Sequence, residues 1–234
     1  MCATTQVAKQ PESPAPNRRF LRPLIFLVVQ FALLFITSGR IAWAGAWLFV
    51  AVCGIGMIAS YLLVPRELLN ARGRVGEGWK KWDKFILPGI IFGPIVMSVV
   101  AGLDVRYAWT RPFSLAQQLF AVVAVLISNG LTVWAMRSNR HFEGVVRIQK
   151  DRDHKVVTSG PYAYARHPGY VGMIVFYVAT PLVLGSRAAV IPAAVVALVL
   201  IARTALEDRM LRQELPGYRE YAERVRCRLL PLVW

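Results

Sequence analysis

The chain has 234 residues, of which 56% are hydrophobic and only 18% are charged, and its formal net charge is +15. A water-soluble domain of this size needs more charged residues to cover its surface. The composition therefore excludes an ordinary soluble protein and indicates a membrane protein.

The N-terminal residues 1–17 are rich in proline, serine and other polar residues, which predicts a disordered tail. The basic and apolar residues behind this tail resemble a signal peptide, and Ala42-Trp43-Ala44 resembles a cleavage site. Because the following chain stays hydrophobic, we expect an uncleaved membrane anchor instead.

Uncharged apolar stretches recur along the rest of the chain, near the length that crosses a hydrocarbon layer of ~30 Å. They comprise residues 24–38, 41–64, 85–103, 114–136, 170–185 and 188–202. The first four have the character of individual spans, and the shorter last two are expected to form a helical hairpin. The sequence thus predicts an all-α, multi-span membrane protein with about six apolar segments. Residues 18–138 form spans one to four, and residues 139–234 form a distinct C-terminal region.

The basic residues are distributed unevenly between these stretches. They concentrate before the first, between the second and third, after the fourth and at the C-terminus, whereas the other turns carry few. This alternation predicts that both termini and the large loops are cytoplasmic. Anionic lipid head groups are then the expected neighbours of the basic residues, and a nucleic-acid partner is disfavoured. A short chain with few spans favours a prokaryotic inner (plasma) membrane.

Common metal and nucleotide motifs are missing from the sequence. No metal-ligand spacing is formed by the cysteines and histidines, which are Cys2, Cys53, Cys227, His141, His154 and His167. The glycine-rich turn of soluble methyltransferase and dinucleotide folds does not occur either. We therefore expect no metal, and any cofactor must be held by another arrangement.

The transition from a polar loop to the fifth apolar stretch is the first candidate site. Pro168 fits the first turn of a helix, whose free N–H groups attract a carboxylate or another anion. Aromatic faces near this helix start suit a sulfonium or another soft cation. The residues that crowd it are Arg166, His167, Tyr162, Tyr164 and Tyr170. An interfacial aromatic belt with an arginine reaching to the membrane surface explains the same residues equally well.

A second cluster of charged residues follows the sixth apolar stretch. Arg203 and Glu207 are four residues apart, so they share one face of a helix, and Asp208 lies beside them. A charge inside hydrocarbon is costly and should face protein or water, which makes the cluster a candidate site. A simple ion pair at a helix end remains an alternative.

Two ordered motifs in this C-terminal region resemble a known family. The sequence His-Lys-Val-Val-Thr-Ser-Gly-Pro-Tyr begins at His154, and Arg-His-Pro-Gly-Tyr-Val-Gly begins at Arg166. They are followed by the cluster at 203–208 and by Gly217-Tyr218 and Tyr221. Together they resemble the isoprenylcysteine carboxyl methyltransferase family and its phospholipid N-methyltransferase relatives.

The resemblance implies S-adenosylmethionine as the cofactor and a set of residues that bind it. These residues are His154, Lys155, Val156, Val157, Tyr162, His167, Pro168, Gly169, Tyr170, Glu207 and Asp208. The family also has a cofactor-contacting glutamine upstream of the first motif. Here Arg147 occupies the strictly spaced position and Gln149 follows two residues later, so Gln149 is the candidate for that contact.

The resemblance further implies that Arg203 and Glu207 are the catalytic residues on the substrate side. We expect direct in-line transfer of the methyl group to a lipophilic small molecule or a lipidated substrate that enters from the bilayer. If the acceptor is a carboxylate, Arg203 would orient it while Glu207 holds the arginine. If it is an amine, Glu207 or Asp208 would take the departing proton.

Three other functions are alternatives to methyl transfer. Membrane sterol and lipid reductases that use NADPH share a related signature, but they usually have Asn where Gly169 stands and an acid where Met173 stands. A transporter or channel is disfavoured because intramembrane charge is almost absent and no inverted repeat is seen. A non-catalytic membrane protein with a degenerate site is the third alternative.

Overall fold

The computed structural model describes residues 18–71 and 78–229, and the predicted N-terminal tail lies outside them. Within the described part, every regular element is helical. The long helices are α1 (Arg18–Ser38), α2 (Ala44–Leu63), α4 (Lys81–Tyr107), α5 (Leu115–Ser138), α6 (Pro168–Leu184) and α7 (Val190–Glu214). The shorter ones are α3 (Arg66–Ala71), η1 (Lys150–Arg152), η2 (Gly160–Ala163) and α8 (Tyr218–Arg224). The all-α prediction is confirmed.

Each predicted apolar stretch corresponds to one of the six long helices, although four of the stretches run one to three residues past a helix end. Four of these helices, α2, α4, α5 and α7, are long and apolar enough to cross a membrane. The other two have shorter apolar parts, Pro23–Ser38 in α1 and the whole of α6. Helices α4 and α7 continue beyond the predicted stretches into charged sequence, and an acid of α4 binds an arginine of α7 in these extensions, as described below.

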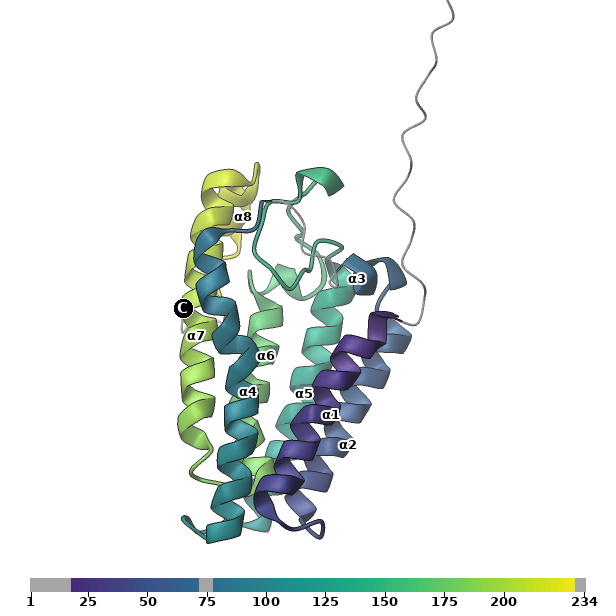
Figure 1. Cartoon of the computed structure of the whole chain (residues 1–234). Helices are drawn as coiled ribbons and strands as arrows, with labels where there is room; N and C mark the ends of the chain where they lie inside the picture. Colours follow the sequence, from purple (N-terminus) through teal and green to yellow (C-terminus); the bar gives the residue numbers. More distant parts are fainter. Residues whose placement is uncertain (1–17, 72–77, 230–234) are drawn as a thin grey trace, which may run out of the picture.

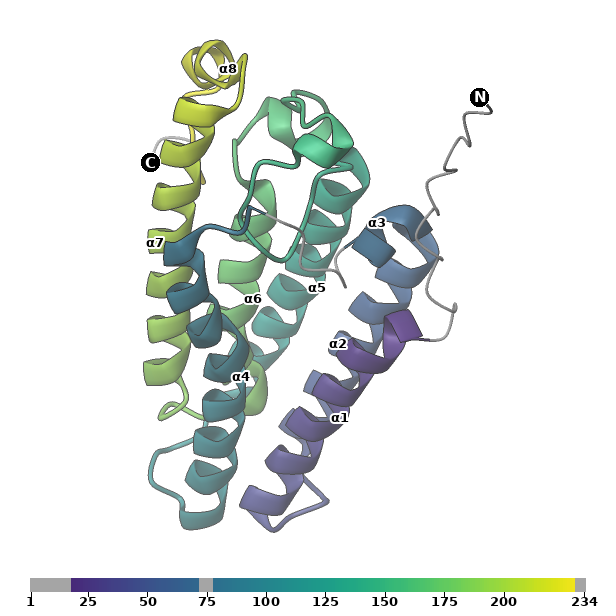
Figure 2. The same ribbon diagram turned by 45° about the horizontal axis from the view of Figure 1, so that its top comes forward.

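The long helices run side by side, and their connections lie at two opposite ends of the bundle (Figure 1). Helix α3, the segment 139–167 and α8 gather at one end, which we call the upper end (Figures 1 and 2). The short turns 39–43, 108–114 and 185–189 lie at the opposite, lower end. The loops rich in basic residues therefore share one end of the bundle, as the alternation of charge predicts.

The core lies between the long helices and is apolar. Leu34, Phe49, Met97, Val125 and Val183 are completely buried, and they come from five different helices. In water, burial of such side chains contributes about 1.5–3 kcal/mol each. Within a bilayer, van der Waals packing between the helices takes the place of the hydrophobic effect. This core holds α6 and α7 in place beneath the upper end.

A buried acid closes the lower end of the bundle. Asp104, near the end of α4, is 3% exposed and accepts hydrogen bonds from the Thr110 amide at 2.8 Å and the Thr110 hydroxyl at 2.7 Å. It also accepts one from the Ser186 hydroxyl at 2.6 Å. The carboxylate thus connects α4 to the turn between α6 and α7.

Helices α5 and α6 approach closely at Gly172. A Cβ atom at this position would lie 2.8 Å from the Ser128 carbonyl oxygen and would overlap the Thr132 side chain. The backbone oxygen cannot move without moving α5. The spacing of these two helices therefore requires glycine at position 172.

Gly172→Ala should destabilise the protein by roughly 1–3 kcal/mol, because it overpacks this helix contact. The matched control is Gly54→Ala, since a Cβ at Gly54 meets nothing within 4 Å. The control should keep or slightly raise stability, because alanine favours a helix over glycine by about 0.5–1 kcal/mol. Thermal unfolding of the detergent-purified variants measures both effects. Equal melting temperatures for the two variants would contradict this account of the contact.

Candidate functional site

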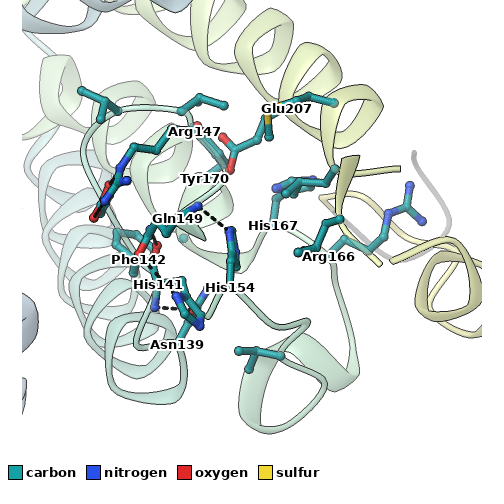
Figure 3. Close-up of a pocket in the computed structure, with 18 of the residues that line it drawn as sticks. Asn139, His141, Phe142, Arg147, Gln149, His154, Arg166, His167, Tyr170 and Glu207 are labelled. Carbon is teal, nitrogen blue, oxygen red and sulfur yellow. Dashed lines mark hydrogen bonds and ion pairs between the residues drawn. The ribbon is translucent and has the colours of Figure 1, made fainter. Parts of the chain in front are cut away.

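A cavity of about 270 Å³ lies at the upper end, between the segment 139–157, the start of α6 and the upper half of α7. Its volume is close to the smaller ligand pockets of proteins, which begin near about 300 Å³. Figure 3 shows Tyr170 and Glu207 toward one side of the site and His141 and His154 toward the other. Helix α4 contributes Leu87 and Ile90 to the wall.

Most of the residues predicted from the sequence meet at this cavity. Those that line it are Gln149, His154, Lys155, Val156, Val157, Tyr162, His167, Gly169, Tyr170, Arg203 and Glu207. Pro168 and Asp208 are not among the lining residues. The fold therefore brings the segment 149–170 together with residues 203–207, more than 30 positions away from Tyr170. The two motifs by themselves do not imply this contact.

Helix α6 begins at the cavity as the sequence predicts. His167 is the N-cap residue and Pro168 opens the first turn. The His167 carbonyl accepts hydrogen bonds from the amides of Tyr170 and Val171, whereas the Gly169 amide donates to no group in the described part of the chain. Because Gly169 lines the cavity, the positive end of the helix dipole faces into it.

Gly169 also allows close packing of the cavity wall. A Cβ atom here would lie 2.8 Å from Cζ of Phe142 and still closer to a neighbouring ring atom. Phe142 itself lines the cavity. A side chain at position 169 would therefore displace an aromatic ring from the site.

Glu207 supplies the acidic side of the cavity. Its Oε2 atom accepts a hydrogen bond from the Tyr170 hydroxyl at 2.5 Å, which joins α7 to α6. The carboxylate forms no ion pair within the described residues. Its second oxygen is available to a ligand.

Arg203 does not bind Glu207, so the expectation that Glu207 holds the arginine is wrong. Its Nε atom donates to Oδ1 of Asp83 at 2.7 Å, and its Nη2 atom donates to Oδ2 at 3.0 Å. Nη2 also donates to the Gly144 carbonyl at 2.8 Å. Two parallel hydrogen bonds from a guanidinium to one carboxylate are among the strongest polar contacts in proteins.

His154 is neutral, and its tautomer follows from its contacts. The backbone N–H of Gln149 donates to Nδ1 of His154 at 3.3 Å, so the ring proton must lie on Nε2. Burial, together with the smaller effects of the neighbouring His141, Arg147 and Arg152, lowers the pKa of His154 to about 4. The two imidazole rings pack with centroids 4.5 Å apart.

Gln149 lines the cavity, but its side-chain amide forms hydrogen bonds mainly within the protein. Its Nε2 donates to the His141 carbonyl at 2.6 Å, and its Oε1 lies 3.3 Å from Nδ1 of His141. Oε1 also accepts from Arg152 at 3.2 Å. Gln149 therefore positions the two histidines, and the contact implied for it by the family resemblance is left to its remaining N–H.

Arg147, at the strictly spaced position, is bound by two acids. Its guanidinium donates to Glu143 at 2.8 Å and to Asp151 at 2.6 Å. The hydrogen bonds to Glu143 and Asp151 raise the pKa of Arg147. The positive charge at this edge of the cavity is thus neutralised.

Asp208 lies behind the cavity wall and holds several groups together. Its side chain is 1% exposed, and it binds Arg166 at 2.7 Å and the Tyr218 hydroxyl at 3.0 Å. It also binds Arg212 and Arg228 at 3.1 Å. Arg166 in turn donates to the carbonyls of Val225 and Arg226. The acid thus ties the start of α6 to the C-terminal segment.

Sequence reasoning missed Asp83, Phe142 and the α4 wall. Asp83 is completely buried, although the only signal for it was a lone acid before the third apolar stretch. Phe142 and the α4 residues carry no signal that separates them from ordinary core. Their proximity to the site depends on long-range packing.

Comparison with known proteins agrees with this geometry. Residues 120–213 match the model of the isoprenylcysteine carboxyl methyltransferase family. The predicted resemblance to this family is confirmed over that region. It includes the loop, α6 and almost all of α7, and therefore most of the cavity wall.

Individual relatives carry the corresponding name. The chain is 36% identical over 90 residues to protein-S-isoprenylcysteine O-methyltransferase B of Arabidopsis thaliana, covering 38% of this chain and 46% of that protein. It is 31% identical over 122 residues to the A form, covering 51% of this chain and 59% of that protein. A third match, to the Schizosaccharomyces pombe protein-S-isoprenylcysteine O-methyltransferase, is 37% identical over 51 residues and covers 22% of each chain.

The matches thus cover at most about three fifths of these curated relatives. All three relatives are eukaryotic, so they do not support the expectation of a prokaryotic membrane.

Lowering the pH should destabilise the site through His154. Its pKa is lower in the folded state, about 4, than the ordinary value of 6.5, so the unfolded chain binds more protons between these values. The contribution of the neutral imidazole to the free energy of unfolding is complete above pH 6.5, and it is lost as the pH falls toward 4.

Melting temperature measured from pH 7.5 to 4.5 tests this. His154→Asn keeps an acceptor near Nδ1 but does not titrate, so its melting temperature should fall less steeply than that of the wild type. Some slope should remain, because burial also lowers the pKa of His141. Identical slopes would rule out His154 as a source of the pH dependence.

Proposed function

We propose that this chain is an integral membrane methyltransferase that uses S-adenosylmethionine to methylate a lipophilic acceptor. One observation carries the proposal. A single cavity joins the donor-binding segment implied by the family resemblance, at 154–170, to Arg203 and Glu207 at the upper end of α7. The names of the relatives support an isoprenylcysteine carboxylate as the acceptor.

The residues of the cavity fit the chemistry of S-adenosylmethionine. A sulfonium or ammonium group suits the available oxygen of Glu207 and the aromatic faces of Tyr170 and Phe142. A carboxylate suits the Gly169 amide at the start of α6. Neutral His154 adds an N–H donor without adding positive charge. When bound, the cofactor supplies a methyl group already activated by its sulfonium charge.

The chain's own residues then align the acceptor. Nη1 of Arg203 makes no hydrogen bond or ion pair within the described residues, so it can donate to an acceptor carboxylate. Glu207 can take a proton if the acceptor is an amine. Holding two reactants in the reactive geometry supplies up to about 7–11 kcal/mol of the barrier, and no metal is needed for this contribution.

The site's place in the membrane suits reactants from two phases. The cavity lies at the upper end of an apolar bundle, next to loops rich in basic residues. We infer that this end faces the cytoplasm, as the positive-inside rule predicts, and that anionic lipids surround it. A polar cofactor reaches the cavity from the water, and a lipid-soluble acceptor reaches it from the bilayer.

Incubation of the purified protein with methyl-labelled cofactor tests the activity. A native-lipid extract and an isoprenylated cysteine are supplied as acceptors, and mass spectrometry identifies the product. We expect a labelled methyl ester on the isoprenylated cysteine. Titration with NADPH tests the reductase alternative, which requires NADPH binding and no methyl transfer.

Glu207→Gln should weaken S-adenosylmethionine binding roughly tenfold or more, because it removes a charge-assisted contact in a partly buried site. Glu214→Gln is the control on the same helix. Glu214 pairs with Lys80 at 2.6 Å, its side chain is 42% exposed, and it does not line the cavity. Calorimetric titration should give wild-type affinity for the control. Wild-type affinity for Glu207→Gln as well would remove Glu207 from the donor site.

A further inference from the structure

Asp83 lies outside the family-matched region but contacts the site directly. It is in the first turn of α4 and is completely buried. Its two oxygens accept the fork of Arg203, at 2.7 and 3.0 Å, across 120 positions of sequence. The matched region, residues 120–213, therefore contains the arginine but not its partner.

The same carboxylate also fixes one wall of the cavity. Its Oδ2 accepts hydrogen bonds from the Val146 amide and from the Trp79 indole, both at 2.8 Å. The Lys80 amide donates to the Val146 carbonyl at 3.1 Å, so the chain before α4 and the segment around Val146 bind each other from both sides. Val146 and Gly144 line the cavity.

These contacts occupy two of the three guanidinium nitrogens of Arg203 and leave Nη1 for a ligand. Its Nε is bound to Asp83, and its Nη2 is bound to both Asp83 and the Gly144 carbonyl. The guanidinium carbon lies 5.8 Å from the centre of the Tyr170 ring. Because the guanidinium is planar, fixing Nε and Nη2 also fixes Nη1.

We propose that Asp83 is a positioning residue for methyl transfer, which holds Arg203 so that Nη1 is presented to the acceptor. The inference rests on the proposed function. A buried ion pair is weak evidence for stability in itself, because desolvation offsets much of the attraction. Here the ion pair orients the guanidinium of Arg203. Orientation matters because a misplacement of 1 Å in a reacting group can cost about 100-fold in rate.

The test compares Asp83→Asn with Asp104→Asn in the full-length protein in lipid nanodiscs. Asp104 is the matched control, because it is a buried acid on the same helix with a similar number of hydrogen bonds but lies at the lower end. Cofactor affinity is measured by calorimetry, and kcat/KM is measured with an isoprenylated cysteine as the varied acceptor.

Asp83→Asn should lower kcat/KM for the acceptor about 10–100-fold while cofactor affinity stays within about twofold of the wild type. Asp83→Glu, which keeps a carboxylate, should recover part of the loss. Asp104→Asn should lower the melting temperature and keep both constants. The inference is overturned if Asp83→Asn weakens cofactor binding and acceptor turnover equally, if it leaves turnover intact, or if Asp104→Asn produces the same loss of turnover.

Asp83→Asn leaves the buried arginine unpaired and can therefore unfold the protein. In that case the double variant Asp83→Asn with Arg203→Met removes both charges. It is compared with Arg203→Met alone, in which Asp83 keeps its hydrogen bonds from the Val146 amide and the Trp79 indole. Equal turnover of these two variants supports an action of Asp83 through Arg203. A further loss in the double variant contradicts it. A wild-type protein that binds the cofactor but methylates no acceptor refutes the proposed function itself, before any variant is compared.

Discussion

Three arginines are buried at the upper end of this bundle, and two of them are bound by a carboxylate from a distant segment. Arg203 on α7 binds Asp83 on α4, and Arg166 before α6 binds Asp208 on α7. Leaving either charge buried without its partner would cost about 3–5 kcal/mol. The two pairs therefore fix how α4, α6 and α7 meet, and the cavity is the space left between them.

The pairs also explain why the site forms where it does. Below them the helices are apolar and pack through small residues such as Gly172. Above them the loop 139–157 has no long helix of its own, so its polar groups are satisfied by side chains such as Gln149 and Asp83. An irregular segment beside a bilayer is stable only when its backbone is paired in this way. The boundary between the apolar helices and the polar loop is the place where a polar ligand and a lipophilic one can meet.

The sequence predicts the helices well, because an uncharged stretch of sufficient length has few alternatives in a membrane. It also predicts the start of α6, since proline after a polar loop is a local signal. The partner of Arg203 was not predictable, because four-residue spacing favours Glu207 whereas the tertiary contact to Asp83 lies 120 residues away. Asp208 illustrates the same limit: its position in the motif resembles a ligand contact, but its neighbours in space are Arg166 and Tyr218.

The local charge of the cavity differs from the charge of the chain. Although the net charge is +15, the cations that line the cavity are paired: Arg147 with Glu143, Lys155 with Asp153, Arg166 with Asp208 and Arg203 with Asp83. His154 is neutral because burial lowers its pKa. Glu207 alone among the lining acids forms no ion pair within the described residues. A cavity with neutralised cations and one available carboxylate favours a positively charged ligand.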